Sequence, residues 1–202
     1  MRRVICLAVL ACAACGSSSG GGGPDGGSGN NVSGTVEGHS IAAQDAVFTF
    51  TSGYPNLPDG VAIVAIADRP NLCALLQSSS LPTGTLNVMG VALLNVGLGT
   101  INTLVTGPYT VIDLTHPPSV PGQYASGFFA SGTCTTNTEY LTNTTSAAFN
   151  VTQVGNTSGT HMKGTFSSMT FVNASGSFSG TIDASYCAAL NAPGNNCIGN
   201  GP

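Results

Sequence analysis

A period of two in hydrophobicity is the feature that most constrains how this chain can fold. It is clearest over residues 178–186, where apolar or small residues alternate with Ser, Thr and Asp. Successive side chains of a β-strand point to opposite faces, so one set faces a core and the other faces water. Similar runs begin at Val32, and they predict β-strands over most of the chain.

Turn signals divide these runs into separate strands. The first prediction is a hairpin in which Val32–Val36 and a strand beginning at His39 flank a tight turn at residues 37–38. The run Val61–Ala67 is apolar at every position, which predicts a central strand covered on both faces. The other predicted strands cover 46–50, 85–96, 108–114, 123–131, 146–154, 160–172 and 176–184.

One short helix is predicted near residues 69–77. Its apolar segment is Leu72–Gln77, and Pro70 suits a first helical turn because its missing N–H costs nothing there. Asp68 is placed to cap the helix with its carboxylate.

The pattern as a whole indicates an all-β protein. About ten strands with turn signals between them are typical of a single antiparallel β-sandwich or barrel. We expect this domain to cover residues 32–190, followed by a turn-rich C-terminal tail at 191–202. A domain of this size buries roughly 70% of its extended-chain surface, which is enough for one core.

Residues 1–14 are typical of a signal peptide. Arg2 and Arg3 precede an apolar stretch that is shorter than the roughly 20 residues of a membrane-spanning helix. The small residues before Cys15 resemble the lipobox of bacterial lipoproteins, in which the cysteine receives the lipid. Cys12 is the alternative lipidation site, and ordinary cleavage near residues 13–14 without a lipid is a third possibility.

Residues 15–31 are predicted to form the lipidated cysteine and a flexible Gly/Ser tether, whose r.m.s. span is roughly 20–25 Å. Three motifs match literally in this region: C-x-x-C at 12–15, G-x-S-x-G at 16–20 and G-x-G-x-x-G at 21–26. We reject the C-x-x-C because one of its cysteines lies in the leader and the other is the expected lipidation site. We reject the two glycine motifs because the strand, turn and helix elements that they need are not supplied by the surrounding residues.

The scarcity of charge excludes several classes of protein. Charged residues make up 6% of the 202 residues, with 4 Lys+Arg, 8 Asp+Glu and a formal net charge of −4. Since two of the basic residues lie in the leader, the folded region is too poor in positive charge to bind nucleic acid. Coiled coils are excluded as well, because the charged heptads they need are missing.

Four cysteines lie beyond the leader and tether: Cys73, Cys134, Cys187 and Cys197. An even number in an exported chain predicts two disulfides. Of the three possible connectivities, we favour the one that joins Cys73 to Cys134 and leaves the other two to close a short loop. Zinc binding is the competing interpretation, but no C-x-x-C lies within the domain, and we expect neither a metal nor a cofactor.

These features together resemble the small, uncharacterised all-β lipoproteins that some bacteria export in large numbers. The resemblance is carried by the leader with Cys15, the Gly/Ser tether, the segments 34–41, 45–47 and 72–76, and the closing segment 176–187. It implies export and a β-fold, and it brings no catalytic residue with it.

Three histidines are the candidates for chemistry: His39, His116 and His161. A catalytic or metal site would need two of them to converge with a carboxylate. The carboxylates considered are Asp45, Asp59, Asp68, Asp113 and Glu139. We expect the histidines to lie on the surface without partners and Asp183 to be solvated, so no catalytic residue is predicted.

Sugar binding is a further possibility. The stretch 133–145 offers hydroxyl groups, and four aromatic side chains are candidate stacking platforms: Tyr124, Phe128, Phe129 and Tyr140. Aromatic residues are only 6% of the chain and Trp is absent, which weakens this interpretation.

The sequence therefore predicts a lipid-anchored, exported β-domain at the bacterial cell envelope, facing the periplasm or the exterior. Its role would be structural or in binding, and its lipid would place it on the membrane. The alternative is a small secreted hydrolase, or a module that binds a carbohydrate or other ligand through the end loops of the sandwich.

Overall fold

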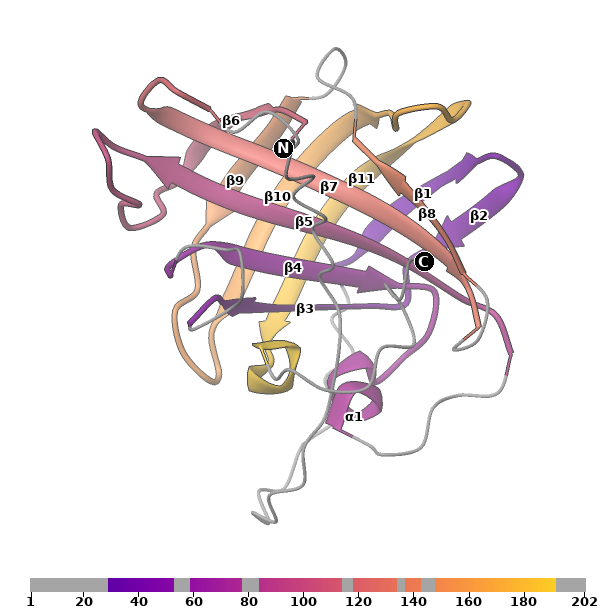
Figure 1. Ribbon diagram of the computed structural model, residues 1–202. Coiled ribbons are helices and arrows are strands. Elements are labelled where there is room, and N and C mark those ends of the chain that lie inside the picture. The colour runs from indigo at the N-terminus through magenta and orange to yellow at the C-terminus, as the bar shows by residue number, and fades with distance from the viewer. Residues whose placement is uncertain are drawn as a thin grey trace, which may run out of the picture.

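The computed structural model describes residues 29–52, 59–77, 84–113, 118–133, 137–142 and 148–191, and their arrangement is shown in Figure 1. Within these residues eleven strands form a single sheet. The strands are β1 (Asn31–Val36), β2 (His39–Ala42), β3 (Asp45–Phe50), β4 (Ala62–Ala67), β5 (Leu86–Val96), β6 (Gly107–Val111), β7 (Gly122–Gly132), β8 (Asn137–Leu141), β9 (Ala148–Gln153), β10 (His161–Met169) and β11 (Gly176–Tyr186). The helical elements are α1 (Leu72–Gln77) and the 3-10 helix η1 (Ala188–Asn191).

Eight of the described strands close into a barrel in the order β10, β9, β6, β7, β5, β4, β3 and β11, because β11 also pairs with β10. The hairpin β1–β2 extends outward from β11, and β8 extends outward from β7. The predicted all-β fold with one short helix is confirmed. Most strand pairs are antiparallel as expected, but β6–β7 and β3–β11 are parallel.

Two long strands of the barrel, β7 and β11, carry the outer strands. One edge of β7 pairs with β6 at Tyr124 and Ala125 and then with β8 from Phe128 onward. One edge of β11 pairs with β1 along its first half and with β3 at its last two residues. Each of these 11-residue strands is therefore long enough to serve the closed barrel with one part and an outer strand with the other.

Side chains fill the inside of the barrel. The ring of Phe129 lies 4.8 Å from that of Phe178, with Tyr140 and Phe171 also in ring contact with it. Phe149 and Phe166 stack at 5.8 Å between centroids. Buried aromatic and aliphatic side chains supply most of the free energy of folding, so this interior is the main core.

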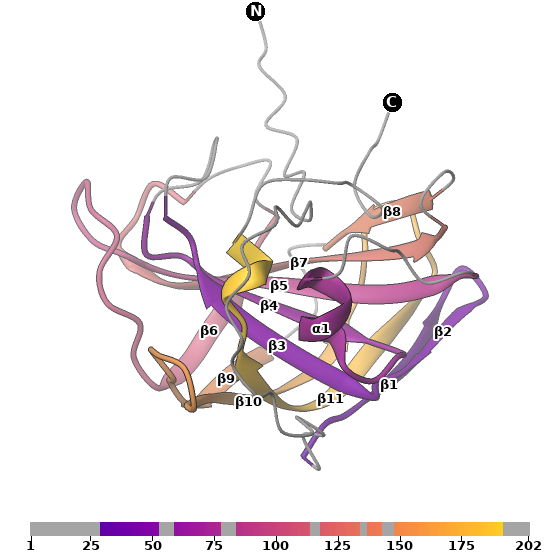
Figure 2. The same ribbon diagram turned by 90° about the horizontal axis from the view of Figure 1, so that it is seen from below.

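β4 is buried at all six positions, which confirms that it is a central strand covered on both faces. Its inward residues belong to the main core, whereas Ile63, Ala65 and Ala67 belong to a second cluster on the outside of the barrel. The same cluster contains Leu72 of α1 and Leu190 of η1. Figure 2 shows α1 and η1 lying over this side of β3 and β4.

α1 is capped from a distant part of the chain. The backbone N–H of Leu72 donates a hydrogen bond to Asp45 Oδ2 at 2.6 Å. Asp68 instead accepts hydrogen bonds from Asn87, so its predicted role as the helix cap is wrong. The helix begins at Leu72 because the cap that fixes its first N–H is the buried carboxylate on β3.

The predicted hairpin forms with the predicted turn. Glu37 and Gly38 both have positive φ, at 49° and 81°, as a tight two-residue hairpin turn requires. The strand β8 lies outside the predicted set, since its sequence carries little apolar alternation. None of the described helices is long and apolar enough to cross a membrane.

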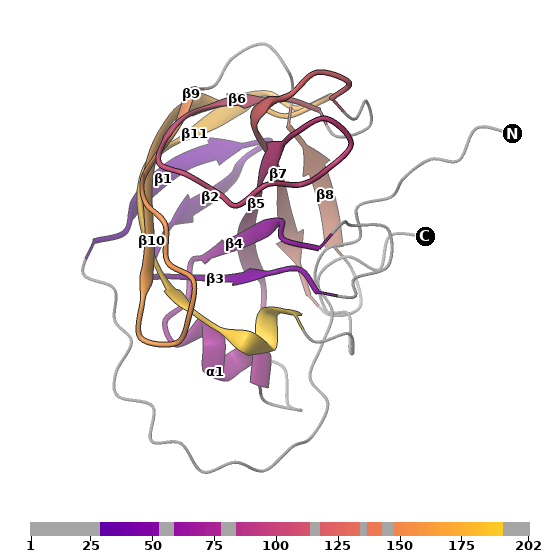
Figure 3. The ribbon, with the colours of Figure 1, turned by 90° about the vertical axis from the view of Figure 1, so that its left-hand side faces the viewer.

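The barrel has two ends that differ in the connections they carry. The hairpin end holds the 37–38 turn, the connection between β4 and β5, and the end of β7. The loop end holds the loops at 97–106, 118–121 and 154–160, and the start of β7. In Figure 1 the loops at 97–106 and 118–121 project to the left, and Figure 3 shows them from that side.

Candidate functional site

A polar cluster closes the main core at the hairpin end. Its members are Asp68 after β4, Asn87 on β5, Ser131 on β7 and His39 on β2. Asp68, Asn87 and Ser131 each lie two residues from a buried core residue, namely Ile66, Met89 and Phe129. Because side chains of a strand alternate, these three positions face the same way as the core. We call the four residues the mouth cluster.

Hydrogen bonds tie the mouth cluster together in two pairs. Ser131 Oγ lies 3.1 Å from His39 Nδ1, so the expectation that His39 has no partner is wrong. Asn87 Nδ2 donates to Asp68 Oδ2 at 2.7 Å and to the carbonyl oxygen of Ser40 at 3.2 Å. Asn87 Oδ1 is buried without a hydrogen-bond partner. Since Asn87 and Ser131 are direct cross-strand partners, the two pairs are adjacent.

The Ser131–His39 pair contains two of the three groups that acyl transfer uses, a hydroxyl and an imidazole. Two observations weigh against catalysis. Ser131 is 4% exposed, which leaves little room for a substrate to reach its oxygen. Glu37, the carboxylate nearest to His39 in the sequence, accepts a hydrogen bond from the backbone N–H of Ser175. That hydrogen bond is the main cause that lowers the pKa of Glu37, and the charge of His39 contributes less.

A second cluster lies on the outside of the barrel, at the start of β10. His161 Nδ1 lies 2.5 Å from Asp183 Oδ1, and Lys163 Nζ donates to Asp183 Oδ2 at 2.7 Å. His161 and Lys163 share one face of β10, as the sequence predicts, and Asp183 is the cross-strand partner of Lys163 on β11. The expectation that Asp183 is merely solvated, and that His161 has no partner, is wrong.

The carboxylate of Asp183 is held ionised by this arrangement. Partial burial alone would raise its pKa, but the hydrogen bonds from Lys163 and His161 outweigh burial and lower the pKa below its ordinary value. The group is therefore a charged anchor between two cationic or hydrogen-bonding side chains. Both partners are partly exposed, which limits what the pair adds to stability.

The same residue also holds the beginning of the folded chain. The backbone N–H of Asp183 donates to Asn30 Oδ1 at 2.8 Å, and Thr181 Oγ1 donates to the carbonyl oxygen of Gly29 at 3.2 Å. A Cβ on Gly29 would lie 2.8 Å from Asp183 Cβ, so only glycine fits there without a shift. The last residues of the predicted tether are therefore fixed against β11.

The remaining predicted site residues do not converge. Asp45 caps α1, Asp59 and Asp113 lie in connections, and Glu139 is exposed on β8. In the part of the chain that the structure describes, no group of three or more His, Cys, Asp and Glu side chains is placed to hold a metal ion. His116 lies outside the described residues, as do Cys12 and Cys15.

The aromatic side chains proposed as sugar platforms serve the fold instead. Phe128 and Phe129 are buried, and Tyr140 stacks on Phe129 with an interplanar angle of 14°. Tyr124 donates its hydroxyl proton to the carbonyl oxygen of Val120. The prediction is wrong for Phe128 and Phe129, because a run of apolar residues in β7 is buried on both faces.

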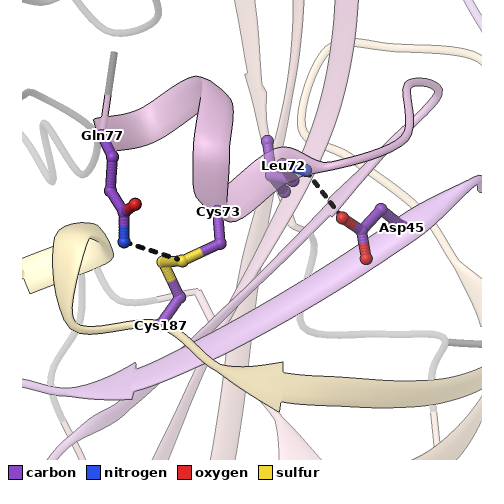
Figure 4. Close-up of a disulfide and its surroundings, with 5 residues drawn as sticks. All are labelled: Asp45, Leu72, Cys73, Gln77 and Cys187. Atoms are coloured by element: carbon purple, nitrogen blue, oxygen red, sulfur yellow. Dashed lines mark hydrogen bonds between the residues drawn. A yellow bond between two sulfur atoms is a disulfide. The ribbon is translucent and has the colours of Figure 1, made fainter. Parts of the chain in front are cut away.

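The disulfide found differs from the predicted pairing. Cys73 of α1 is joined to Cys187, which follows β11, with their Cα atoms 5.7 Å apart (Figure 4). The expected Cys73–Cys134 bond is therefore wrong, and so is a Cys187–Cys197 bond. Sequence spacing could not show that α1 lies against the end of β11. Cys134 and Cys197 lie outside the described residues.

Sequence reasoning missed Ser131 and Asn87, and it missed the role of Asn30. Ser131 and His39 are 92 residues apart, so no local motif links them. The only signal in the sequence is that Ser131 lies two residues after Phe129 on one strand, and therefore on the face that points toward the core. No family model matches this chain, and no curated protein or solved structure matches it either.

Proposed function

We propose that this protein is an exported, lipid-anchored β-domain that binds a partner at the bacterial cell envelope. The leader, Cys15 and the Gly/Ser tether support the anchor. The hydrogen bonds that fix Gly29 and Asn30 to β11 support a folded domain that is attached firmly to the end of that tether.

The observation that carries the binding role is a polar surface on the outside of the barrel. The outward side chains of β1, β11, β10 and β9 are in register across the sheet. One row consists of Asn31, Thr181, Thr165 and Asn150, and a second begins with Ser33 and Ser179. We call this surface the hydroxyl face.

The hydroxyl face favours a neutral partner. On these four strands the acidic, basic and imidazole side chains are Asp183, Lys163 and His161, and the last two both bind Asp183. Short hydroxyl and amide side chains donate and accept hydrogen bonds and lose little rotamer entropy on binding. A neutral, hydroxyl-rich glycan of the envelope is the class that fits this chemistry.

The anchor is tested by replacing the candidate cysteines in the full chain. We expect Cys15→Ser to abolish incorporation of a labelled fatty acid and to move the protein out of the membrane fraction. Cys12→Ser is the matched control and should remain labelled and membrane-bound. If labelling survives Cys15→Ser and is lost in Cys12→Ser, the lipid is attached to Cys12. If the wild type is not labelled, the proposed lipid anchor is overturned.

The binding role is tested with isolated envelope polysaccharide. We expect the wild-type chain to co-sediment with it and Thr165→Arg to reduce binding about tenfold, since the arginine places an unpaired charge in the centre of the face. Thr138→Arg, at an exposed position on β8, is the matched control. Equal binding by both variants and the wild type would assign the contact to another surface.

A second candidate function rests on the Ser131–His39 pair. If the mouth cluster opens to admit an ester or amide, Ser131 would be the nucleophile and His39 the base. A fluorophosphonate probe would then label the wild type and leave Ser131→Ala unlabelled. Absence of labelling in both proteins would remove the hydrolase from consideration.

A further inference from the structure

Three apolar side chains stand out from the surface at the loop end. Leu98 is 89% exposed, Val120 is 62% exposed and Val105 is 43% exposed. Leu98 and Val105 lie between β5 and β6, and Val120 lies just before β7. The end of β5 and the start of β7 are neighbours, since Val96 pairs with Gly122. The loops that carry these three residues therefore lie at one end of the barrel, which faces the viewer in Figure 3.

Hydrogen bonds hold the loops that carry these residues. The N–H of Gly97 donates to the carbonyl oxygen of Thr100 at 2.8 Å, which closes the turn around Leu98. Tyr109 Oη donates to the carbonyl oxygen of Val105 at 2.8 Å. Tyr124 Oη donates to the carbonyl oxygen of Val120 at 2.9 Å. The apolar side chains are thus presented on fixed loops, so little conformational entropy is lost when they are covered.

The loops are also uncharged. No Asp, Glu, Lys or Arg occurs at 97–106 or 118–121. The carboxylate nearest to these loops along the chain is Asp113, and it has an interaction partner. An uncharged loop tip with exposed Leu and Val suits the boundary between headgroups and acyl chains, where charged groups are costly.

The described part of the chain begins on the same side of the barrel. β1 runs toward the hairpin end, where Val36 pairs with Gly176, and it begins at Asn31 opposite Thr181. Gly29 lies beside Asp183, further along β11 toward the loop end. Gly29, where the described residues begin, therefore lies closer to the loop end than the start of β1 does.

We propose that the loop end is a bilayer-contacting surface, with Leu98, Val105 and Val120 inserted into the interface of the membrane that holds the anchor. This inference rests on the proposed lipid anchor. Three aliphatic side chains give weak binding alone, but a tether of roughly 20–25 Å keeps them at a high effective concentration near the bilayer. Contact would hold the hydroxyl face in a defined orientation to the membrane.

The test uses the absence of tryptophan from the chain. Leu98→Trp in the lipidated, full-length protein provides a single reporter at the loop end. On phosphatidylcholine vesicles we expect its emission to shift to shorter wavelength and to be quenched by brominated acyl chains. Both effects should persist at high salt, since the contact is apolar. Val172→Trp is the matched control, because Val172 is an exposed apolar residue just before the start of β11, at the hairpin end of the barrel.

A second arm of the experiment separates failure of this inference from failure of the proposed lipid anchor. The same variants carrying a hexahistidine tag in place of the leader are held on vesicles that contain a nickel-chelating lipid, whether or not Cys15 is lipidated. A blue shift and quenching at position 98, with neither at position 172, support the inference in either arm. Water-like emission at position 98 while the protein is vesicle-bound, or equal quenching at both positions, overturns it.

Discussion

The outward-facing side chains of β4 and β11 lie in opposite environments, although the chain as a whole carries little charge. β4 is buried on both faces and needs α1, η1 and the Cys73–Cys187 bond to cover its outer side. β11 alternates buried and exposed residues, and its outer side faces water with Ser, Thr and Asp. The contribution of an outward side chain to stability therefore depends on what covers it. The same substitution should lower the free energy of unfolding by very different amounts on the two strands.

Loss of the disulfide should lower the free energy of unfolding the most, because the bond holds α1 against the outer side of β4. Replacing Cys73 and Cys187 together with serine frees a loop of 114 residues in the unfolded chain. We expect the free energy of unfolding to fall by about 4 kcal/mol. Urea unfolding under non-reducing conditions measures this, with peptide mapping of the unreduced wild type to confirm the bond. A Cys73–Cys134 peptide in that map would contradict the structure.

The outward side chains of the two strand groups come next. Ile63 on β4 is 1% exposed and belongs to the cluster under α1 and η1. Ile63→Ala should lower the free energy of unfolding by about 3 kcal/mol, since it leaves a cavity. Thr165→Ala on β10, an exposed outward position, should change it by no more than about 0.5 kcal/mol. Equal losses in the two variants, measured by urea unfolding, would mean that the outer side of β4 is not covered as described.

The distant cap of α1 has a smaller effect. Asp45 is 2% exposed and accepts hydrogen bonds from the N–H groups of Ala46 and Leu72. Asp45→Ala leaves two buried donors unsatisfied and should lower the free energy of unfolding by about 2 kcal/mol. Asp68→Ala, which removes the residue first expected to cap the helix, should lower it by about 1 kcal/mol because Asp68 is less buried. If urea unfolding shows a larger loss for Asp68→Ala than for Asp45→Ala, Asp45 is not the main cap of α1.

The smallest effect concerns the cluster that Asp183 forms with His161 and Lys163 on the outside of the barrel. The folded pKa of Asp183 is lowered, so the stability it contributes is present above its unfolded pKa of about 3.9 and is lost as pH falls through the folded pKa. The free energy of unfolding of the wild type should exceed that of Asp183→Asn by less than about 1 kcal/mol at neutral pH. In urea unfolding at a series of pH values, the difference should begin to shrink below about pH 4 and should vanish once the pH is below the folded pKa of Asp183. A difference that grows in acid would reverse the sign of the proposed interaction.

Local patterns were enough for the elements whose residues interact with near neighbours. The alternation in 176–186, the turn at Glu37 and Gly38, and the apolar run of β4 each follow from backbone geometry and burial within one segment. The mouth cluster and the cluster of Asp183, His161 and Lys163 could not be predicted in the same way. Their partners come from different strands, and the register between strands decides which side chains meet.

The all-β class, the short helix and the abundance of side-chain hydroxyl groups can be read from the residues along the chain. The pairing of Cys73 with Cys187, and the capping of Leu72 by Asp45 from 27 residues away, arise only when distant segments pack together. The same holds for β11, which closes the barrel by pairing with β10 and β3. Conformational propensity acts over a few residues, whereas closure and cross-linking depend on which distant surfaces bury one another.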